Sequence, residues 1–234
     1  MTKTGLGLSG NQLKLIALIT MTLDHIGAYL LPQYEILRLI GRLSMPIYAF
    51  LIAEGCYHTR NKLKYLGLMA GLGLVCQLVY YFAMDSLYQC ILVTFSLSII
   101  LIYALQYVQR KKNTLSCILF AIALAGVYYI CMKLPYRLPG FAIDYGLPGV
   151  LLPVFFSFGS TKPQKLLGGA VGMCVMASGS ISMQWYSLLA LLPLALYNGR
   201  RGKGSYKYLF YIYYPLHLVI IYAVGWIMER GGIL

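Results

Sequence analysis

Acidic and other charged residues are scarce in this sequence. Its 234 residues include six Asp or Glu and 19 Lys or Arg; 11% of the residues are charged and 60% are hydrophobic. Soluble domains contain about a quarter charged residues, and a chain of this length buries only part of its surface. The scarcity of charge therefore excludes a soluble fold and predicts an integral membrane protein in contact with the lipid bilayer.

The sequence also lacks any metal-binding spacing. Its cysteines are dispersed through the apolar runs, without a CxxC pair or a Cys/His pattern, so we expect small buried side chains and no metal. They are Cys56, Cys76, Cys90, Cys117, Cys131 and Cys174. The net charge of +13 is spread over short clusters between apolar runs. Such clusters are typical of cytoplasmic loops and form no continuous patch, so we expect no nucleic acid as a partner.

No stretch of the chain is polar enough to form a separate soluble domain. The longest connections, 133–143 and 199–206, span only about ten residues. The first apolar run carries Asp24 and His25 and has no convincing cleavage site, which argues against a signal peptide. We therefore expect residues 1–234 to form a single transmembrane domain without internal repeats.

Nine apolar runs have lengths that favour membrane-spanning helices. They cover residues 12–31, 36–57, 63–84, 91–109, 114–132, 144–158, 165–180, 183–198 and 207–228. The sixth contains Gly146, Pro148, Gly149 and Pro153 and is a candidate for a broken or re-entrant segment. The predicted fold class is thus all-α, a polytopic transmembrane bundle of about nine helices.

The orientation follows from the basic residues. Fourteen of the 19 lie in alternate connections of the nine-helix scheme, at residues 3–14, 60–64, 110–112, 162–165 and 200–207. Because cytoplasmic loops are enriched in Lys and Arg, the N-terminus is predicted to lie in the cytoplasm and the C-terminus outside.

Several ionisable residues fall inside the predicted spans, where they are costly and usually face a partner or a cavity. Asp24, His25, Arg38 and Arg42 lie in the outer halves of the first two spans. The others are Glu54 and His58 near the inner end of the second span, Asp144 at the start of the sixth, and His217 near the middle of the ninth.

The two arginines are four residues apart and share one helix face, so they need an anion. Asp24, Asp144 or a phosphate or oxyanion of a ligand would serve. The adjacent Asp24 and His25 point about 100° apart. An arrangement that satisfies both has Asp24 neutralising an arginine while His25 faces an open cavity.

Each of these residues also has a purely structural interpretation. An Asp24–Arg38 pair can hold two helices together, and Glu54 can pair with Arg60 or Lys62. His217 can bond a neighbouring carbonyl, and His58 can be a solvated histidine at the cytoplasmic rim.

Together the residues carry the groups that acyl transfer needs. A neutral imidazole takes the proton of an attacking amine or hydroxyl, and an arginine stabilises the oxyanion that forms. The same groups also serve a proton-coupled small-molecule transporter, and intramembrane charges can bind a partner helix in a non-catalytic assembly factor.

Three segments resemble the TraX family. They are LKLIALITMTLDHIGAYLLPQYEILRLIGRLSMPIYAFLIAEGCYHT at 13–59, DYGLPGVLLP at 144–153 and KYLFYIYYPLHLVIIY at 207–222. The resemblance runs through most of the chain, although residues 90–140 add little.

The resemblance implies a multi-pass protein of the inner membrane, in a family whose namesake is associated with N-acetylation of pilin. It is similar to membrane acyltransferases that use cytosolic acetyl-CoA, in which a histidine of the first helix and nearby arginines serve catalysis. Carried over to this sequence, the catalytic candidates are His25 as the base, Asp24, His217 and Asp144. The candidates for contacts with the acyl donor are Arg38, Arg42, Glu54, His58 and Tyr145.

The predicted orientation adds a constraint on the donor. Acyl-CoA is cytosolic, and the basic loops 60–64 and 200–207 lie at the inner face, where Lys and Arg suit its phosphates. The acceptor is expected outside or within the membrane, and the sequence leaves a peptide, a glycan and a small molecule open.

Overall fold

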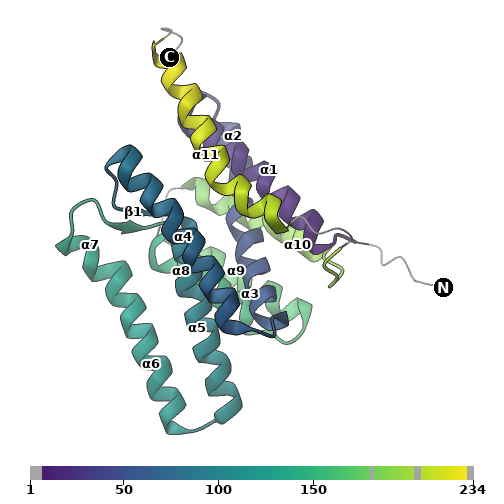
Figure 1. Cartoon of the computed structure of the whole chain (residues 1–234). Helices are drawn as coiled ribbons and strands as arrows, with labels where there is room; N and C mark the ends of the chain where they lie inside the picture. Colours follow the sequence, from purple (N-terminus) through teal and green to yellow (C-terminus); the bar gives the residue numbers. More distant parts are fainter. Residues whose placement is uncertain (1–6, 180–181, 203–206, 231–234) are drawn as a thin grey trace. The chain divides into compact units, whose positions relative to one another are not determined.

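The computed structural model describes residues 7–179, 182–202 and 207–230 and is almost wholly helical there (Figure 1). The chain divides into two compact units. Unit 1 comprises Met1–Tyr48 and Ser180–Leu234, and unit 2 comprises Ala49–Gly179. The predicted all-α class is confirmed. Lys3 and Lys203, which belong to the predicted basic clusters, lie outside the described residues.

Unit 1 starts with a helix whose first turn is closed by side chains. Helix α1 (Gly10–Tyr29) has Ser9 as its N-cap, and the Ser9 and Gln12 side chains bond each other's backbone in a capping box. It packs against α2 (Glu35–Gly41) and α11 (Lys207–Arg230), beside which it lies in Figure 1. A parallel bridge between Leu8 and Tyr197 holds the start of α1 to the chain that follows α10 (Leu191–Ala195).

The helix expected over 36–57 is interrupted. Helix α2 ends at Gly41, and α3 (Ser44–His58) begins after a turn at Arg42 and Leu43. Pro46 has no N–H to donate to the Arg42 carbonyl, so the ladder of hydrogen bonds cannot continue through this point. The chain tightens instead, and Leu43 N–H donates to Ile40 O at 3.2 Å.

The eighth predicted span is also not a regular α-helix. Residues Ser182–Ala190 form a 3-10 helix, η2, which leads into the short α10. With three residues per turn, a 3-10 helix brings side chains at positions i and i+3 onto one face. In η2 this spacing places Gln184 and Ser187 together.

Unit 2 is a bundle of five longer helices with two short strands. Strand β1 (Tyr88–Gln89) pairs in parallel with β2 (Ala142–Ile143), with Tyr88 opposite Ala142. The helices are α4 (Lys62–Met84), α5 (Ile91–Lys111), α6 (Thr114–Tyr128), α8 (Gly146–Ser157) and α9 (Lys162–Ser178). Helix α8 packs against both α5 and α9. Its Phe156 lies edge-on to Phe50 of α3 at a ring-centroid distance of 5.5 Å.

The fifth predicted span is longer than expected. After α6 the chain passes through one wide π-turn, η1 (Tyr129–Lys133), and ends in α7 (Leu134–Arg137). Pro135 lacks the N–H that would bond Cys131 O, which explains why the regular helix widens just before it.

The sixth predicted span, a candidate for a broken or re-entrant segment, forms one unbroken helix, α8; that it is re-entrant stays a prediction. Pro148 lies in the first turn of α8, where an absent N–H costs nothing, and the helix also accommodates Pro153. Its 12 residues rise only about 18 Å, less than the roughly 30 Å of a bilayer core.

Four helical segments of the described chain are long and apolar enough to cross a membrane: Glu35–His58, Lys62–Phe82, Ile91–Lys111 and Thr114–Arg137. Large apolar side chains point outward, as at Leu63 and Phe82, which are 82% and 81% exposed. The chain is a membrane protein. The number of crossings expected from the other runs, and the orientation, stay predictions.

Candidate functional site

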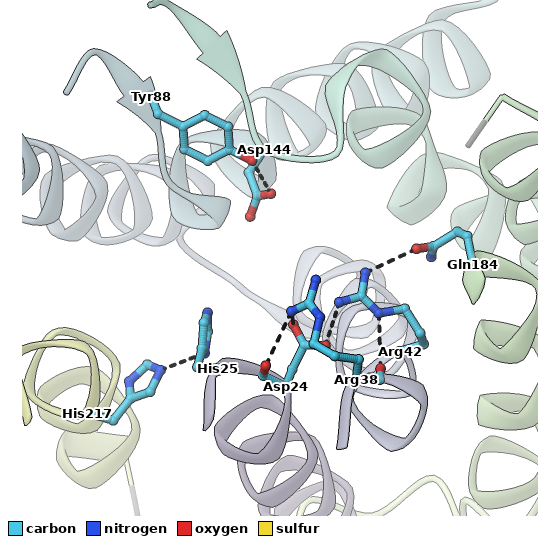
Figure 2. Close-up of polar contacts among 8 residues, drawn as sticks. All are labelled: Asp24, His25, Arg38, Arg42, Tyr88, Asp144, Gln184 and His217. Carbon is cyan, nitrogen blue, oxygen red and sulfur yellow. Dashed lines mark hydrogen bonds and ion pairs between the residues drawn. The ribbon is translucent and has the colours of Figure 1, made fainter. Parts of the chain in front are cut away.

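The centre of unit 1 holds one carboxylate between two guanidinium groups (Figure 2). Asp24 Oδ2 accepts a hydrogen bond from Arg38 Nη1 at 2.8 Å, and its Oδ1 accepts one from Arg42 Nη2 at 2.5 Å. The pairing of Asp24 with an arginine, expected from the sequence, is confirmed, and the carboxylate binds both arginines. The side chains of Asp24 and Arg42 are about seven-eighths buried.

A close approach between helices makes this arrangement possible. Gly41 of α2 lies against Asp24 so tightly that a Cβ atom at this position would collide with the aspartate side chain. One turn further along α1, a Cβ on Gly27 would lie 2.8 Å from the Cβ of Leu37. These two glycines let α1 and α2 approach closely enough for Asp24 to bind both arginines.

The arginines of this cluster outnumber its carboxylate. Two guanidinium groups share one carboxylate, which leaves one formal positive charge among Asp24, Arg38 and Arg42. The guanidinium groups favour binding of an anion or of an oxygen atom that becomes negative during a reaction.

Gln184 of η2 is part of the site, although no sequence motif pointed to it. Its Oε1 accepts a hydrogen bond from Arg42 Nη1 at 3.3 Å. The residue lies in an apolar run, far from Arg42 along the chain, in a segment whose 3-10 form the sequence pattern does not reveal. We found no signal that would have singled it out.

His25 projects from α1 about 100° away from Asp24 and contacts His217 of α11. The His25 Nδ1 and His217 Nε2 atoms are 3.1 Å apart, and His217 Nδ1 lies 3.0 Å from Tyr213 O (Figure 2). The expectation that His217 can bond a neighbouring carbonyl is confirmed. His25 does not face open space on its Nδ1 side, because that atom meets the second imidazole.

The contacts fix the proton positions of the pair. A carbonyl oxygen only accepts hydrogen bonds, so His217 Nδ1 carries a proton. With both rings neutral, His217 Nε2 is then an acceptor and His25 Nδ1 is the donor. The remaining nitrogen of His25, Nε2, therefore carries a lone pair, and no side chain of the described ranges bonds it.

Aromatic rings surround the histidine pair. The Tyr213 ring stacks on His217 at 5.2 Å, and the Tyr29 ring stacks on His25 at 6.2 Å. The hydroxyl of Tyr213 lies 2.7 Å from Thr22 Oγ1 of α1. These contacts restrict the orientation of both imidazoles and tie α11 to α1.

Asp144 lies in unit 2, just after β2. Its Oδ1 accepts a hydrogen bond from the Tyr88 hydroxyl at 2.7 Å, and its backbone O accepts one from Thr94 Oγ1 at 2.9 Å. The following Tyr145 adopts a left-handed conformation, with φ of 57°, as the N-cap of α8. These contacts assign Asp144 a position within unit 2, where it connects β1, α5 and α8.

The partner of Glu54 differs from the one expected. Its carboxylate pairs with Lys165 Nζ of α9 and lies 3.5 Å from His58 Nε2, one turn along α3. Lys62 donates instead to Gln106 Oε1 at 2.6 Å. The structural interpretation in which Glu54 pairs with Lys62 or Arg60 was wrong, because Lys165 of α9 reaches this end of α3 and contacts both Glu54 and Tyr57. No group of three or more metal-ligating side chains occurs within the described ranges.

The family model described as TraX protein matches residues 9–225. The chain is 28% identical to a probable fimbrial assembly protein, FimC of serogroup H1, from Dichelobacter nodosus, over 91% of this chain and 94% of that protein. It is 49% identical over 45 residues to an uncharacterised protein of Rickettsia prowazekii (strain Madrid E), covering 19% of this chain and 18% of that protein. No solved structure matches significantly.

Proposed function

Because the chain belongs to the TraX family, we propose that it is a membrane-bound acyltransferase that moves an acetyl group from acetyl-CoA to an amine or hydroxyl. The observation that carries the proposal is the juxtaposition, within unit 1, of a histidine whose Nε2 meets no side chain of the described residues and two arginines around one carboxylate. The two are joined through the adjacent residues Asp24 and His25.

His25 is the proposed general base. Its Nε2 accepts the proton of the acceptor while the acceptor's nitrogen or oxygen attacks the thioester carbonyl. The imidazolium that results keeps its Nδ1–H directed at His217 Nε2, which stabilises the new charge. When the carbon–sulfur bond breaks, the proton on Nε2 passes to the departing thiolate, so that CoA leaves as the thiol.

Arg42 is the proposed stabiliser of the oxyanion. It is the more buried of the two arginines, with 12% of its side chain exposed, compared with 33% for Arg38. An arginine held rigidly by Asp24 and Gln184 needs little reorganisation as negative charge develops on the carbonyl oxygen. Arg38, which is more exposed, is the candidate for contact with the donor.

The printed name of the Dichelobacter nodosus relative favours one class of acceptor. That protein is called a probable fimbrial assembly protein, and we therefore place a fimbrial or pilus subunit first among the peptide acceptors. A glycan or a small molecule remains an alternative. The non-catalytic assembly factor is the alternative function that the same name favours.

Acetyl-CoA binding and turnover test the proposal. Purified chain in lipid nanodiscs is titrated with acetyl-CoA by calorimetry, and thiol release is followed with candidate acceptors. We expect saturable binding by wild type, loss of thiol release by about 10²- to 10⁴-fold in His25→Gln, and weaker donor binding in Arg38→Gln.

Arg137→Gln serves as the control for removal of an arginine, since Arg137 lies at the end of α7 in unit 2. If the folded wild-type protein does not bind acetyl-CoA, the proposed acyltransferase activity is refuted. Proton-coupled uptake of a small molecule into vesicles would then support the transporter. A hydrogen-bonded pair of histidines can also relay protons in such a protein.

A further inference from the structure

We propose that Gln184 and Ser187 donate hydrogen bonds to a negatively charged oxygen atom of a ligand beside Arg42. The site is the side of η2 that carries both residues, together with the guanidinium that Gln184 contacts. The ligand of this site is an oxyanion or a carboxylate. Only the identity of the molecule that carries this oxygen rests on the proposed function.

The orientation of the Gln184 amide follows from its partner. Arg42 has only N–H donors, so the amide must turn its oxygen toward the guanidinium, and Oε1 does accept from Arg42 Nη1. The amide nitrogen Nε2, with two protons to donate, then points away from Arg42. This nitrogen is buried and has no hydrogen-bond partner among the described residues. Gln184 as a whole is 5% exposed.

Ser187 has the same character. It is fully buried, and its Oγ has no hydrogen-bond partner within the part of the chain that the structure describes. Other buried serines have an acceptor: Ser96 Oγ donates to Leu92 O at 2.7 Å, and Ser98 Oγ donates to Val150 O at 2.7 Å. The i, i+3 spacing in a 3-10 helix puts Gln184 and Ser187 on one face of η2, so two buried donors without a described partner belong to the face that carries the contact with Arg42.

Unused buried donors on one face indicate a ligand that accepts hydrogen bonds. The guanidinium of Arg42, which Gln184 contacts, adds the second criterion, that the ligand atom be negative. Arg42 connects the ion cluster to η2, because it bonds both Asp24 and Gln184. Two sources of such an oxygen are consistent with this: the carbonyl oxygen of the acyl group as it becomes an oxyanion, and a carboxylate of the acceptor.

Anion binding tests the site independently of turnover. The melting temperature of the full chain in nanodiscs is measured in sodium acetate and in sodium chloride at equal ionic strength. We expect acetate to raise the wild-type melting temperature by about 2–4 °C near saturation. An equal melting temperature in both salts would overturn the proposal, whatever the enzyme assay shows.

Variants of Gln184 and Ser187 test whether their side chains donate the hydrogen bonds to acetate. Gln184→Glu keeps the acceptor for Arg42 but replaces the donor Nε2 with an oxygen, and we expect it to abolish the acetate response while it still folds. Ser187→Ala removes a hydroxyl without a partner, so it should weaken the response without lowering the melting temperature in chloride. Variants that respond to acetate as wild type does would overturn the proposal.

Matched controls come from the other unit. Gln77→Met removes a half-buried amide of α4, whose Oε1 has no partner among the described residues, and should leave the acetate response unchanged. Ser98→Ala removes a hydroxyl that is bonded, so it should lower the melting temperature and keep the response.

Thiol release from acetyl-CoA then distinguishes the two sources. If the oxygen is that of the acyl group, Gln184→Glu lowers kcat by about 10²-fold and leaves the dissociation constant of acetyl-CoA nearly unchanged. If the oxygen belongs to a carboxylate of the acceptor, the same variant raises KM for the acceptor. Wild type that binds acetate but never acetyl-CoA would retain this site and refute only the proposed enzyme.

Discussion

At the scale of the residue, adjacent positions on α1 have separate roles because a helix turns about 100° per residue. Asp24 faces α2 and binds Arg38 and Arg42, while His25 faces α11 and contacts His217. One turn of helix therefore presents an ion cluster on one side and a proton acceptor on the other. This division is what allows a single short motif to contribute to both parts of the proposed reaction.

Removing the shared carboxylate should destabilise unit 1. Asp24→Asn leaves Arg42 largely buried without its counter-ion, and we expect the free energy of unfolding to fall by about 3 kcal/mol, near the lower end for a broken buried ion pair. The double variant Asp24→Asn/Arg42→Gln should recover part of the loss. Thermal melts in nanodiscs measure both.

Glu35→Gln is the control for loss of an acidic side chain. Glu35 is exposed in the first turn of α2, and its loss should cost at most about 1 kcal/mol. An Asp24→Asn protein as stable as this control would contradict a structural role for the cluster.

At the scale of the element, the turn between α2 and α3 positions the ion cluster. Arg42 caps the end of α2 because Pro46 interrupts the hydrogen-bond ladder there. Its Nε also donates to Arg38 O at 3.3 Å, so the guanidinium is held by its own helix as well as by Asp24. Arg38 O therefore accepts from both the backbone N–H and the Nε–H of Arg42.

The contact between α1 and α2 should be intolerant of a single added methyl group. Gly41→Ala would place a Cβ into the Asp24 side chain, and we expect a loss of about 1–3 kcal/mol from overpacking together with reduced acyl transfer. Gly67→Ala in α4 is the matched control, because no atom lies within 4 Å of its added Cβ. This control should be neutral or stabilising by up to about 1 kcal/mol. Equal melting temperatures for the two variants would contradict the close approach.

At the scale of the whole molecule, the positive-inside pattern makes a prediction about orientation. The two ends of the helical segment 114–137 should lie on opposite sides of the membrane, with 110–112 in the cytoplasm. In a chain whose six native cysteines are replaced by alanine, Lys111→Cys and Tyr136→Cys add one exposed thiol near either end.

A membrane-impermeant maleimide should label Tyr136→Cys in intact cells and Lys111→Cys only after the membrane is opened. The reverse pattern would invert the predicted orientation, and labelling of both in intact cells would show that 114–137 does not cross.

The sequence by itself determined the class of this protein and its polar residues. Apolar runs and clustered Lys and Arg are local properties, so they identified an all-α membrane protein and placed most helix ends within a few residues. The scarcity of charge drew attention to Asp24, Arg38 and Arg42, because an ionised group in an apolar helix requires a partner. The four-residue spacing of the arginines showed in advance that they share a face.

Only the tertiary structure decided which partners meet. The pairing of Glu54 with Lys165, the bond between His25 and His217, and the place of Gln184 beside Arg42 each join residues more than 100 positions apart. Such contacts depend on how helices pack, and packing depends on shape at positions such as Gly41 that hydrophobicity does not distinguish. The 3-10 form of η2 likewise leaves no trace in an apolar run, and it is this geometry that aligns Gln184 with Ser187.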